Sequence, residues 1–484
     1  IASFFWETMV HHHSYVIGGN SSYEYCGAED KLSDRLSDNT CETCNTYNML
    51  KLTRHLFCWA PSASYGDYYE RALYNHILAS QNPENGMMTY FVPLRMGTQK
   101  EFSDSFHTFT CCVGTGMENH SKYGEGIYYK GSDGSLYVNL FIPSALQWKE
   151  KGLSVTQQTD YPASGHTSFT LALTKPTAFP IRIRKPWWAK KAPVVKINGK
   201  NYSYTTDANG FLLLSKQWKD KDQVTVDFTM DLYAEAMPDN KDRIALLYGP
   251  LVLAGQLGDS LPDPVYGIPV LLTDDKNVSD WLKPVPGKSL QFAMQKVGTP
   301  FDATLVPFYQ TYKQHYTVYW DYFSPAAWEN KKAAYEAEKK RQREIEASTV
   351  DYFRIGEMQP ERDHNLKATE RSYVDNALGV NGREARANNH ISFTMKVDSA
   401  KNNSLLLVYL GDDKDRRFDI LVDGKLLITV DWKGGEANKF FPMEYPLPAA
   451  MTSGKTSISV SIEANHGTTT ARVFGVRTIL TKTI

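Results

Sequence analysis

The chain has 484 residues, and its 53 basic and 54 acidic side chains give a formal net charge of −1. This balance excludes a nucleic-acid or membrane-surface role driven by bulk charge. All six cysteines lie within the first 112 residues, which excludes a disulfide-stapled scaffold, whose cysteines would be spread through the chain. The length predicts about three domains. No apolar run reaches the about 18 residues of a membrane helix, so we expect no membrane insertion.

Residues 1–130 carry the residue spacing of helices. Apolar side chains recur at intervals of three and four residues in 44–59 and again in 67–79, which predicts two amphipathic helices. Turn-forming pairs follow at 82–83 and 85–86, and glycines punctuate a short predicted helix after the cysteine pair at 111–112. We therefore predict a helical domain over residues 1–130.

From about residue 134 the apolar pattern alternates, as strands do. Asn198-Gly199 and Asn209-Gly210 stand beside apolar runs, where type I′ hairpin turns are expected. These features predict a β-sandwich over residues 131–255. The continuous apolar run 244–254 is broken only by Gly249-Pro250, and it predicts a buried strand pair that packs on the helical part.

The remaining chain predicts a β-rich segment with a connector helix over 256–348 and a second sandwich or jelly roll over 349–484. Ser324-Pro325 combines an N-cap residue with proline at the first helical position, and 326–347 is charged on most faces. Alternation then resumes, with an Asp423-Gly424 turn. The fold class predicted for the whole chain is multidomain α + β.

The cysteines offer the clearest chemistry. Residues 41–44 read Cys-Glu-Thr-Cys, and an adjacent pair stands at 111–112. Four interpretations are open: buried free thiols, a structural zinc site of Cys41, Cys44, Cys111 and Cys112, a catalytic site in which a carboxylate replaces one thiolate, and a redox pair at 41 and 44. The redox pair has the least support, because no βαβ pattern surrounds it. Glu42 and Cys44 can converge on a metal only where the backbone is extended or turning, as at the entry to a helix.

Three sequence blocks carry a family resemblance. They are SYVIGGNSSYEYCG (14–27), ETCNTYNMLKLT (42–53) and FTCCVGTGMENHSKYG (109–124). Together they resemble the β-L-arabinofuranosidase glycoside hydrolases of families 127 and 146. The resemblance implies an (α/α)6 catalytic barrel followed by β-sandwich domains. Twelve helices form such a barrel, and residues 1–130 would supply about five of them, so the resemblance implies that further barrel residues precede this sequence.

The resemblance also implies roles for individual residues. Cys111 would be the nucleophile and Glu24 the general acid/base, with Tyr90 near the nucleophile. His12 would contact sugar hydroxyls, although its spacing also fits a histidine on a helix surface. Cys41 is an extra thiol that would compete as a ligand, whereas we expect Cys26 and Cys58 to be packing residues. The implied zinc ligands are Glu42, Cys44, Cys111 and Cys112.

The predicted function is a zinc-dependent, retaining exo-glycosidase that releases β-linked L-arabinofuranose, or a related sugar, from plant polysaccharide side chains. The alternative is a non-catalytic carbohydrate-binding or scaffold protein with a structural, cysteine-rich zinc site. An oligosaccharide or polysaccharide is the expected partner, and no nucleic acid is expected. The resemblance favours a periplasmic or secreted location. Residues 349–484 resemble the carbohydrate-binding jelly rolls appended to such enzymes, whose exposed aromatic residues can stack on sugars, although aromatic residues in this pattern more often form the sandwich core. The sequence predicts no particular oligomeric state.

Overall fold

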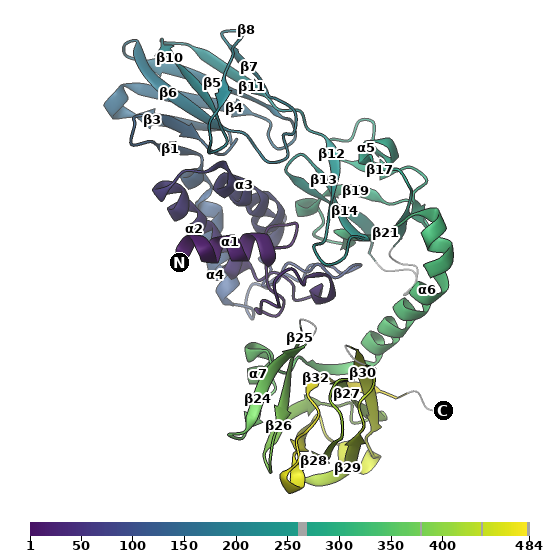
Figure 1. Cartoon of the computed structure of the whole chain (residues 1–484). Coiled ribbons are helices and arrows are strands. Elements are labelled where there is room, and N and C mark those ends of the chain that lie inside the picture. The colour runs from purple at the N-terminus through teal and green to yellow at the C-terminus, as the bar shows by residue number, and fades with distance from the viewer. Residues whose placement is uncertain (260–268, 378–379, 437–438, 482–484) are drawn as a thin grey trace. The chain divides into compact units, whose positions relative to one another are not determined.

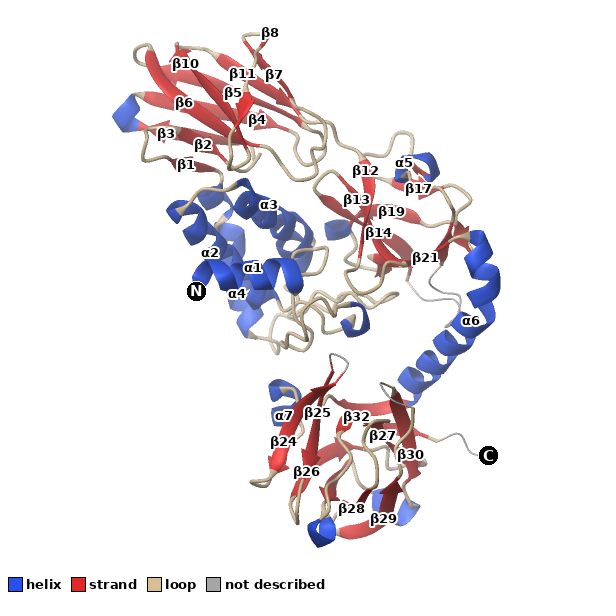
Figure 2. Cartoon of the chain, viewed as in Figure 1, coloured by secondary structure: helices blue, strands red, loops and turns tan. Residues whose placement is uncertain are grey.

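The computed structural model describes residues 1–259, 269–377, 380–436 and 439–481 (Figure 1). The chain forms two compact units, Ile1–Asn330 and Lys331–Ile484. Helices predominate at the start of the first unit, and strands make up most of the remaining chain (Figure 2). The multidomain α + β class is therefore confirmed. Within the described ranges, no helix is both long enough and apolar enough to cross a membrane.

The helical region holds four α-helices in the first 130 residues, all of them described. They are α1 (Ala2–His12), α2 (Thr43–Trp59), α3 (Ala63–Ala72) and α4 (Cys111–Ser121). The helix predicted over 44–59 is observed as α2. The helix predicted over 67–79 is only partly regular, because α3 continues as a π turn, Leu73–Ile77, and a 3-10 turn, Leu78–Ser80. Four helices do not close a barrel, so the partial (α/α)6 barrel stays a prediction.

The helices pack around the indole of Trp6, which is fully buried. The Trp6 Nε1–H donates to Thr53 Oγ1 at 2.7 Å, and this bond joins α1 to α2. Leu50 and Leu56 of α2 and Tyr68 of α3 belong to the same buried cluster. This packing fixes the middle of α2, the helix whose first turn carries part of the candidate site.

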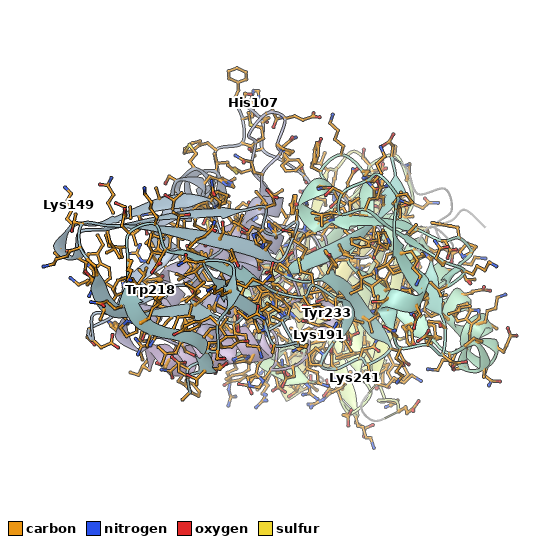
Figure 3. All side chains as sticks on the ribbon, turned by 90° about the horizontal axis from the view of Figure 1, so that it is seen from above. His107, Lys149, Lys191, Trp218, Tyr233 and Lys241 are labelled. Atoms are coloured by element: carbon orange, nitrogen blue, oxygen red, sulfur yellow. The ribbon has the colours of Figure 1, made fainter. Side chains whose placement is uncertain are left out.

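A β-sandwich follows the helices, as the alternating pattern predicted. Its five-stranded sheet has the order β1 (Tyr128–Lys130), β2 (Leu136–Val138), β6 (Thr177–Arg184), β10 (Phe211–Trp218), β9 (Thr205–Thr206). Its six-stranded sheet has the order β3 (Ser144–Trp148), β4 (Leu153–Thr159), β5 (His166–Leu173), β11 (Gln223–Asp227), β7 (Val194–Ile197), β8 (Lys200–Asn201). Trp218, labelled in Figure 3, is fully buried in the core between them.

The two predicted hairpin turns of this sandwich differ in outcome. Asn198 and Gly199 have φ angles of 52° and 77°, so the type I′ turn between β7 and β8 is confirmed. At Asn209-Gly210 only the glycine has a positive φ, 85°, and the type I′ prediction is wrong. The side chain of Asp207 is the reason, because its Oδ1 accepts from the backbone N–H groups of Asn209 and Phe211, each at 3.0 Å.

A third sheet begins before residue 255, where the predicted division falls inside a strand. Its order is β16 (Leu282–Pro284), β17 (Phe292–Met294), β19 (Thr304–Pro307), β14 (Leu251–Gly258), β13 (Arg243–Tyr248), β21 (Tyr319–Phe323), β15 (Val270–Leu272), β18 (Gly298–Thr299). Also, β12 (Leu232–Ala236) pairs with β13, and β20 (His315–Thr317) pairs with β14. The short helix α5 (Val278–Trp281) precedes β16. Residues 260–268 of the predicted segment lie outside the described residues.

The apolar run 244–254 forms the pair β13 and β14, joined by the two-residue turn Gly249-Pro250. Gly249 has a φ of 52°, which glycine adopts without steric cost. Leu247 and Val252 of the pair share a buried cluster with Ile17 and Leu94 of the helical region. The predicted packing of this strand pair on the helical part is confirmed.

Buried ion pairs also tie α3 to the strands. The fully buried guanidinium of Arg184, at the end of β6, donates from Nη1 to Asp67 Oδ1 at 2.7 Å and from Nη2 to Glu70 Oε1. Arg71 makes a bidentate pair with Glu235 of β12, both N···O distances being 2.8 Å. Bidentate and buried pairs of this kind fix orientation as well as position.

The connector helix α6 (Pro325–Ser348) matches the prediction for 326–347, and the Ser324 hydroxyl accepts from the Ala327 N–H at its start. The second unit then forms two sheets. One contains β24 (Ser372–Ala377), β25 (Val380–Ala385), β32 (Val473–Leu480), β27 (Asn403–Leu410), β30 (Phe440–Pro446) and β22 (Thr349–Phe353). The other contains β23 (Lys367–Ala368), β26 (His390–Lys396), β31 (Ser457–Glu463), β28 (Arg416–Val422) and β29 (Lys425–Trp432).

A continuous core of apolar side chains fills this second unit. Its short helices are α7 (Met358–Asp363) and α8 (Ala449–Thr452). Asp423 and Gly424 both have positive φ angles, 47° and 76°, so the predicted turn between β28 and β29 is confirmed.

Candidate metal centre and active site

Two helix N-termini meet at the candidate site. Glu42 is the N-cap residue of α2, with extended backbone (φ −61°, ψ 130°), and Cys44 lies in the first turn of the same helix. Cys111 and Cys112 are the first two residues of α4. The Thr43 N–H donates to the Tyr90 carbonyl at 3.0 Å, which anchors the start of α2 to a neighbouring segment. Glu42 and Cys44 therefore converge at the entry to a helix, as their spacing required.

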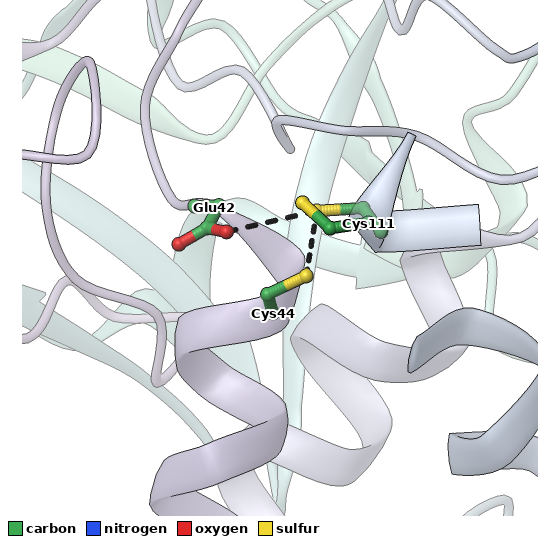
Figure 4. Close-up of side chains that lie close together, drawn as sticks. Glu42, Cys44 and Cys111 are labelled. Atoms are coloured by element: carbon green, nitrogen blue, oxygen red, sulfur yellow. Dashed lines mark hydrogen bonds between the residues drawn. The ribbon is translucent and has the colours of Figure 1, made fainter. Parts of the chain in front are cut away.

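The four side chains Glu42, Cys44, Cys111 and Cys112 form one group whose ligand atoms all lie within 4.8 Å of one another. The Sγ of Cys112 is 3.2 Å from Cys44 Sγ, 3.9 Å from Cys111 Sγ and 3.8 Å from Glu42 Oε1. Figure 4 shows the side chains of Glu42, Cys44 and Cys111 pointing toward one another. Ligands about 2.3 Å from a tetrahedral ion lie about 3.8 Å from each other. The three separations from Cys112 differ from this value by at most about 0.6 Å, and the widest in the group by at most about 1 Å, so small side-chain shifts would let the group hold one metal ion.

Cys41 is not a member of this group. Its side chain is fully buried in the apolar cluster that contains Tyr15, Ile17 and Val92. Burial raises the pKa of its thiol well above the usual range, as expected for a thiol in apolar surroundings. The four residues that the structure brings together are thus those with the carboxylate, and not the all-cysteine set.

The four ligand residues have shifted pKa values, because their side chains are partly buried and lie close to one another. The hydrogen bond from the Cys112 thiol lowers the pKa of Cys44 to about 6, and the same bond, together with burial, raises the pKa of Cys112. Burial and the nearby Cys44 also raise the pKa of Cys111. Burial, followed by the charge of Cys44, raises the pKa of Glu42 to about 7. A bound cation would relieve this repulsion and displace the retained protons.

The four ligand residues differ in access to solvent. Cys112 is fully buried and Cys44 is 8% exposed, whereas Cys111 is exposed. The Tyr90 hydroxyl donates a short hydrogen bond to Glu24 Oε1 and also interacts with the Cys111 thiol. Burial, the hydrogen bond to Glu24 and the interaction with Cys111 raise the pKa of Tyr90, so its phenol stays a donor. Glu24, Tyr90 and Cys111 thus lie in one chain of polar contacts.

His12 does not join this constellation through any contact between described residues. It ends α1, and its Nδ1 lies 3.0 Å from Asp30 Oδ2. This hydrogen bond raises the pKa of the imidazole. A substrate contact for His12 therefore stays a prediction.

A threonine hydroxyl on α4 also contacts the ligand group. Thr115, which the sequence interpretation missed, has its Oγ1 3.2 Å from Cys44 Sγ. Its spacing of four from Cys111 on a helix could have indicated this position, because residues at i and i+4 share a helix face.

Cys26 is half-buried, but Cys58 is exposed, so the expectation that Cys58 is a packing residue is wrong.

Comparison with known families assigns two segments of the first unit. Residues 1–125 match the catalytic domain of the GH127 β-L-arabinofuranosidases, and residues 135–230 match the middle domain of the same family. Residues 344–479 match a family of unknown function, DUF6805.

Individual relatives agree with these matches. The chain is 23% identical over 280 residues to a non-reducing end β-L-arabinofuranosidase of Bifidobacterium longum subsp. longum, an alignment that covers 54% of this chain and 42% of that protein. A GH127 β-L-arabinofuranosidase structure from Geobacillus stearothermophilus T6 has a TM-score of 0.55 at 19% identity, covering 66% of this chain and 56% of that one. A solved glycoside hydrolase has a TM-score of 0.53 at 21% identity, covering 66% and 61%.

The chain thus spans about half the length of the relatives it matches, and at these identities the solved structures show the fold alone. All three sequence blocks that carried the resemblance lie within the segment matched by the catalytic domain. The resemblance of this chain to the glycoside hydrolases of family 127 is therefore confirmed, with the catalytic-domain match in residues 1–125 and the middle-domain match in residues 135–230.

Proposed function

We propose that this chain contributes the catalytic centre of a retaining exo-glycosidase that releases β-linked L-arabinofuranose, or a closely related sugar. The observation that carries the proposal is the four-residue ligand group with Cys111 as its exposed member, near Tyr90, whose hydroxyl donates to Glu24. A carboxylic acid and a nucleophile brought together in this way are the two groups that retaining hydrolysis needs.

The ligand set of Glu42, Cys44, Cys111 and Cys112 fits zinc. Three sulfur atoms and one carboxylate oxygen suit a borderline-soft cation that prefers tetrahedral coordination. When bound, zinc would hold the Cys111 sulfur as a thiolate at neutral pH and fix its position. The buried thiols of Cys44 and Cys112 would keep the site in place, while the exposed Cys111 can reach a substrate.

In the first step the Cys111 thiolate attacks the anomeric carbon of the terminal sugar. The glycosidic C–O bond breaks, and protonated Glu24 gives its proton to the departing oxygen. The product of this step is a sugar joined to Cys111 by a C–S bond, with Glu24 left as a carboxylate.

In the second step Glu24 acts as a base. Its carboxylate takes a proton from water, and the water oxygen attacks the anomeric carbon. The C–S bond then breaks, and the electron pair returns to the Cys111 sulfur. Two displacements at the same carbon restore the starting anomeric configuration, and Glu24 ends protonated, ready for another cycle.

Tyr90 holds the two reacting groups in register. Its hydroxyl donates to the Glu24 carboxylate, and the phenol also responds electrostatically to the Cys111 thiol, so Tyr90 lies near both proposed reacting groups. General acid/base catalysis by a positioned side chain, here Glu24, contributes about 10²–10⁴-fold to the rate.

The competing hypothesis is a scaffold with a purely structural zinc site. A structural site fills its coordination positions with protein ligands, as these four residues would, but the exposed side chain of Cys111 leaves one ligand accessible to a substrate. A carbohydrate-binding role for residues 349–484 and a periplasmic or secreted location stay predictions.

The experiment that tests the function compares Cys111→Ser and Glu24→Gln with the unchanged chain on an aryl β-L-arabinofuranoside. The matched control is Cys58→Ser, which replaces another exposed thiol outside the ligand group. We expect both site variants to lose at least about 10³-fold in kcat while the control keeps full activity. Turnover by Cys111→Ser at the parent rate would refute the nucleophile assignment. Loss of fold together with zinc in Cys111→Ser would favour the scaffold.

A further inference from the structure

The hydroxyl of Thr115 contacts one of the proposed metal ligands from the neighbouring helix. Thr115 lies on α4, and its Oγ1 is 3.2 Å from the Sγ of Cys44 on α2. It stands four residues after Cys111 and three after Cys112, which places all three side chains on one face of the helix. The hydroxyl is half-buried and therefore partly shielded from competing water.

The hydroxyl has one hydrogen to donate and several acceptors within reach. The carbonyl oxygens of Cys111 and Cys112 each lie 3.4 Å from Oγ1, farther than the Cys44 sulfur. A neutral Cys44 thiol would donate to the hydroxyl, which would then donate to a carbonyl. A metal-bound Cys44 carries no proton and can only accept, so the hydroxyl must turn its hydrogen toward the sulfur.

We propose that Thr115 is a positioning residue that donates a hydrogen bond to the Cys44 thiolate and thereby sets both the orientation of this ligand and the strength of zinc binding. The inference rests on the proposed zinc site. A hydrogen bond to a thiolate withdraws part of its negative charge and fixes its side-chain rotamer. The positioning effect favours zinc binding, because Thr115 lies on the helix that carries Cys111 and Cys112 and holds the Cys44 sulfur beside them.

Zinc affinity of the full chain tests this role. The variants are Thr115→Val, which keeps the shape and removes the donor, and Thr115→Ser, which keeps the donor. Thr46→Val is the matched control, because Thr46 lies on α2 two residues after Cys44, but its hydroxyl contacts His76 Nδ1 at 2.9 Å instead of a ligand. Competition with a chromophoric chelator gives the zinc Kd, and the sulfur-to-cobalt charge-transfer band of the Co²⁺ form reports directly on the thiolates.

We expect the zinc Kd of Thr115→Val to rise about 10–100-fold, with a shifted cobalt band, and Thr115→Ser to recover most of the loss. Thr46→Val should bind zinc as the parent does. A parental Kd and band in Thr115→Val, or a loss that Thr115→Ser does not recover, would overturn the proposal. Thr115→Ala provides a second donor-free variant, and circular dichroism of each metal-free form checks the fold.

Failure of this inference is distinguishable from failure of the zinc site itself. Cys44→Ala should abolish zinc binding if the site is correct, whatever the role of Thr115. If Cys44→Ala loses zinc while Thr115→Val binds normally, only the role of Thr115 is refuted. If Cys44→Ala binds zinc like the parent, the zinc site and this inference both fail.

Discussion

Cys111 and Cys112 are neighbours in the sequence, but their sulfur atoms have different surroundings. Cys112 is fully buried against Cys44, whereas Cys111 is exposed beside Tyr90. The same contrast separates Cys41, buried in an apolar cluster, from Cys44 in the ligand group. From the sequence spacing, Cys41 could also have been a metal ligand. The direction in which each thiol points depends on tertiary packing, which the spacing does not report.

Metal content tests the separation of Cys41 from Cys44. We expect Cys44→Ala to lose zinc and Cys41→Ala to keep one ion per chain, because only Cys44 lies in the ligand group. Cys41→Ala should cost about 1–2 kcal/mol of folding stability through lost packing. Elemental analysis of the purified variants gives the stoichiometry. Loss of zinc from Cys41→Ala with its fold intact would instead favour the all-cysteine site.

Tyr90→Phe tests the contact that joins Glu24 to Cys111. A hydrogen bond to a charged group contributes about 1.5–3 kcal/mol, so we expect kcat to fall about 10–100-fold. Zinc content should be unchanged, because Tyr90 is not a member of the ligand group. Steady-state kinetics on the aryl substrate measures this, with Tyr25→Phe as the control next to Glu24. Unchanged kcat in Tyr90→Phe would show that the phenol does not position the reacting groups.

At the scale of elements, ion pairs hold α3 against the strands that follow it. Arg184 reaches from β6 to Asp67 and Glu70 of α3, and its guanidinium has no exposed surface. Arg182, two residues earlier on the same strand, makes its pairs with Asp133 and Asp207 near solvent. The two arginines therefore offer a matched pair of a buried and a surface ion pair on one strand.

Arg184→Met should destabilise the first unit by about 3–5 kcal/mol, because it removes the cation paired with the fully buried Glu70 carboxylate and the partly buried Asp67 carboxylate. Arg182→Met should change the stability by no more than about 1 kcal/mol. Urea unfolding followed by tryptophan fluorescence compares them, since Trp188 Nε1 donates to Glu70 Oε2 in the affected region. Equal stability of the two variants would mean that the buried pairs contribute nothing to holding α3 in place.

Elements with strong local signals could be predicted from the sequence. Periodicity located α2 and α6, and two-residue turns located the hairpins at Asn198-Gly199 and Asp423-Gly424. The turn at Asn209-Gly210 failed because the upstream side chain of Asp207 captured the backbone N–H groups. The predicted division at residue 255 falls inside β14, because this part of the chain pairs with distant strands: Arg243 of β13 lies opposite Asp321 of β21, 78 residues later (321 − 243), and no local pattern reports such a contact.

The three sequence blocks indicated the four ligand residues and Glu24, the proposed acid/base. The structure brings the four ligand residues together. Cysteine spacing by itself left four interpretations open. Thr115 was missed because a threonine inside a helix has no distinctive motif. Its role depends on where a second helix places Cys44, which is a tertiary property.

For the whole molecule, the division into Ile1–Asn330 and Lys331–Ile484 predicts two separately folding parts. A chain ending at residue 330 should keep its zinc and its kcat/KM on the aryl substrate, because the residues proposed for zinc binding and catalysis, Thr115 included, all lie before residue 116. Calorimetry should show the loss of one unfolding transition. A truncated chain that unfolds or loses zinc would show that the second unit is needed for the site.

Covalent trapping determines whether Cys111 carries the sugar during turnover. Glu24→Gln slows release of the intermediate, because the base that activates water is missing. After reaction with an aryl β-L-arabinofuranoside that has a good leaving group, acid quenching and peptide mass mapping locate the adduct. We expect the Glu24→Gln chain to carry one anhydropentose on the peptide that contains Cys111. The chain with Cys111→Ser should carry none. An adduct on a carboxylate, or full turnover with Cys111 replaced, would contradict this role of Cys111.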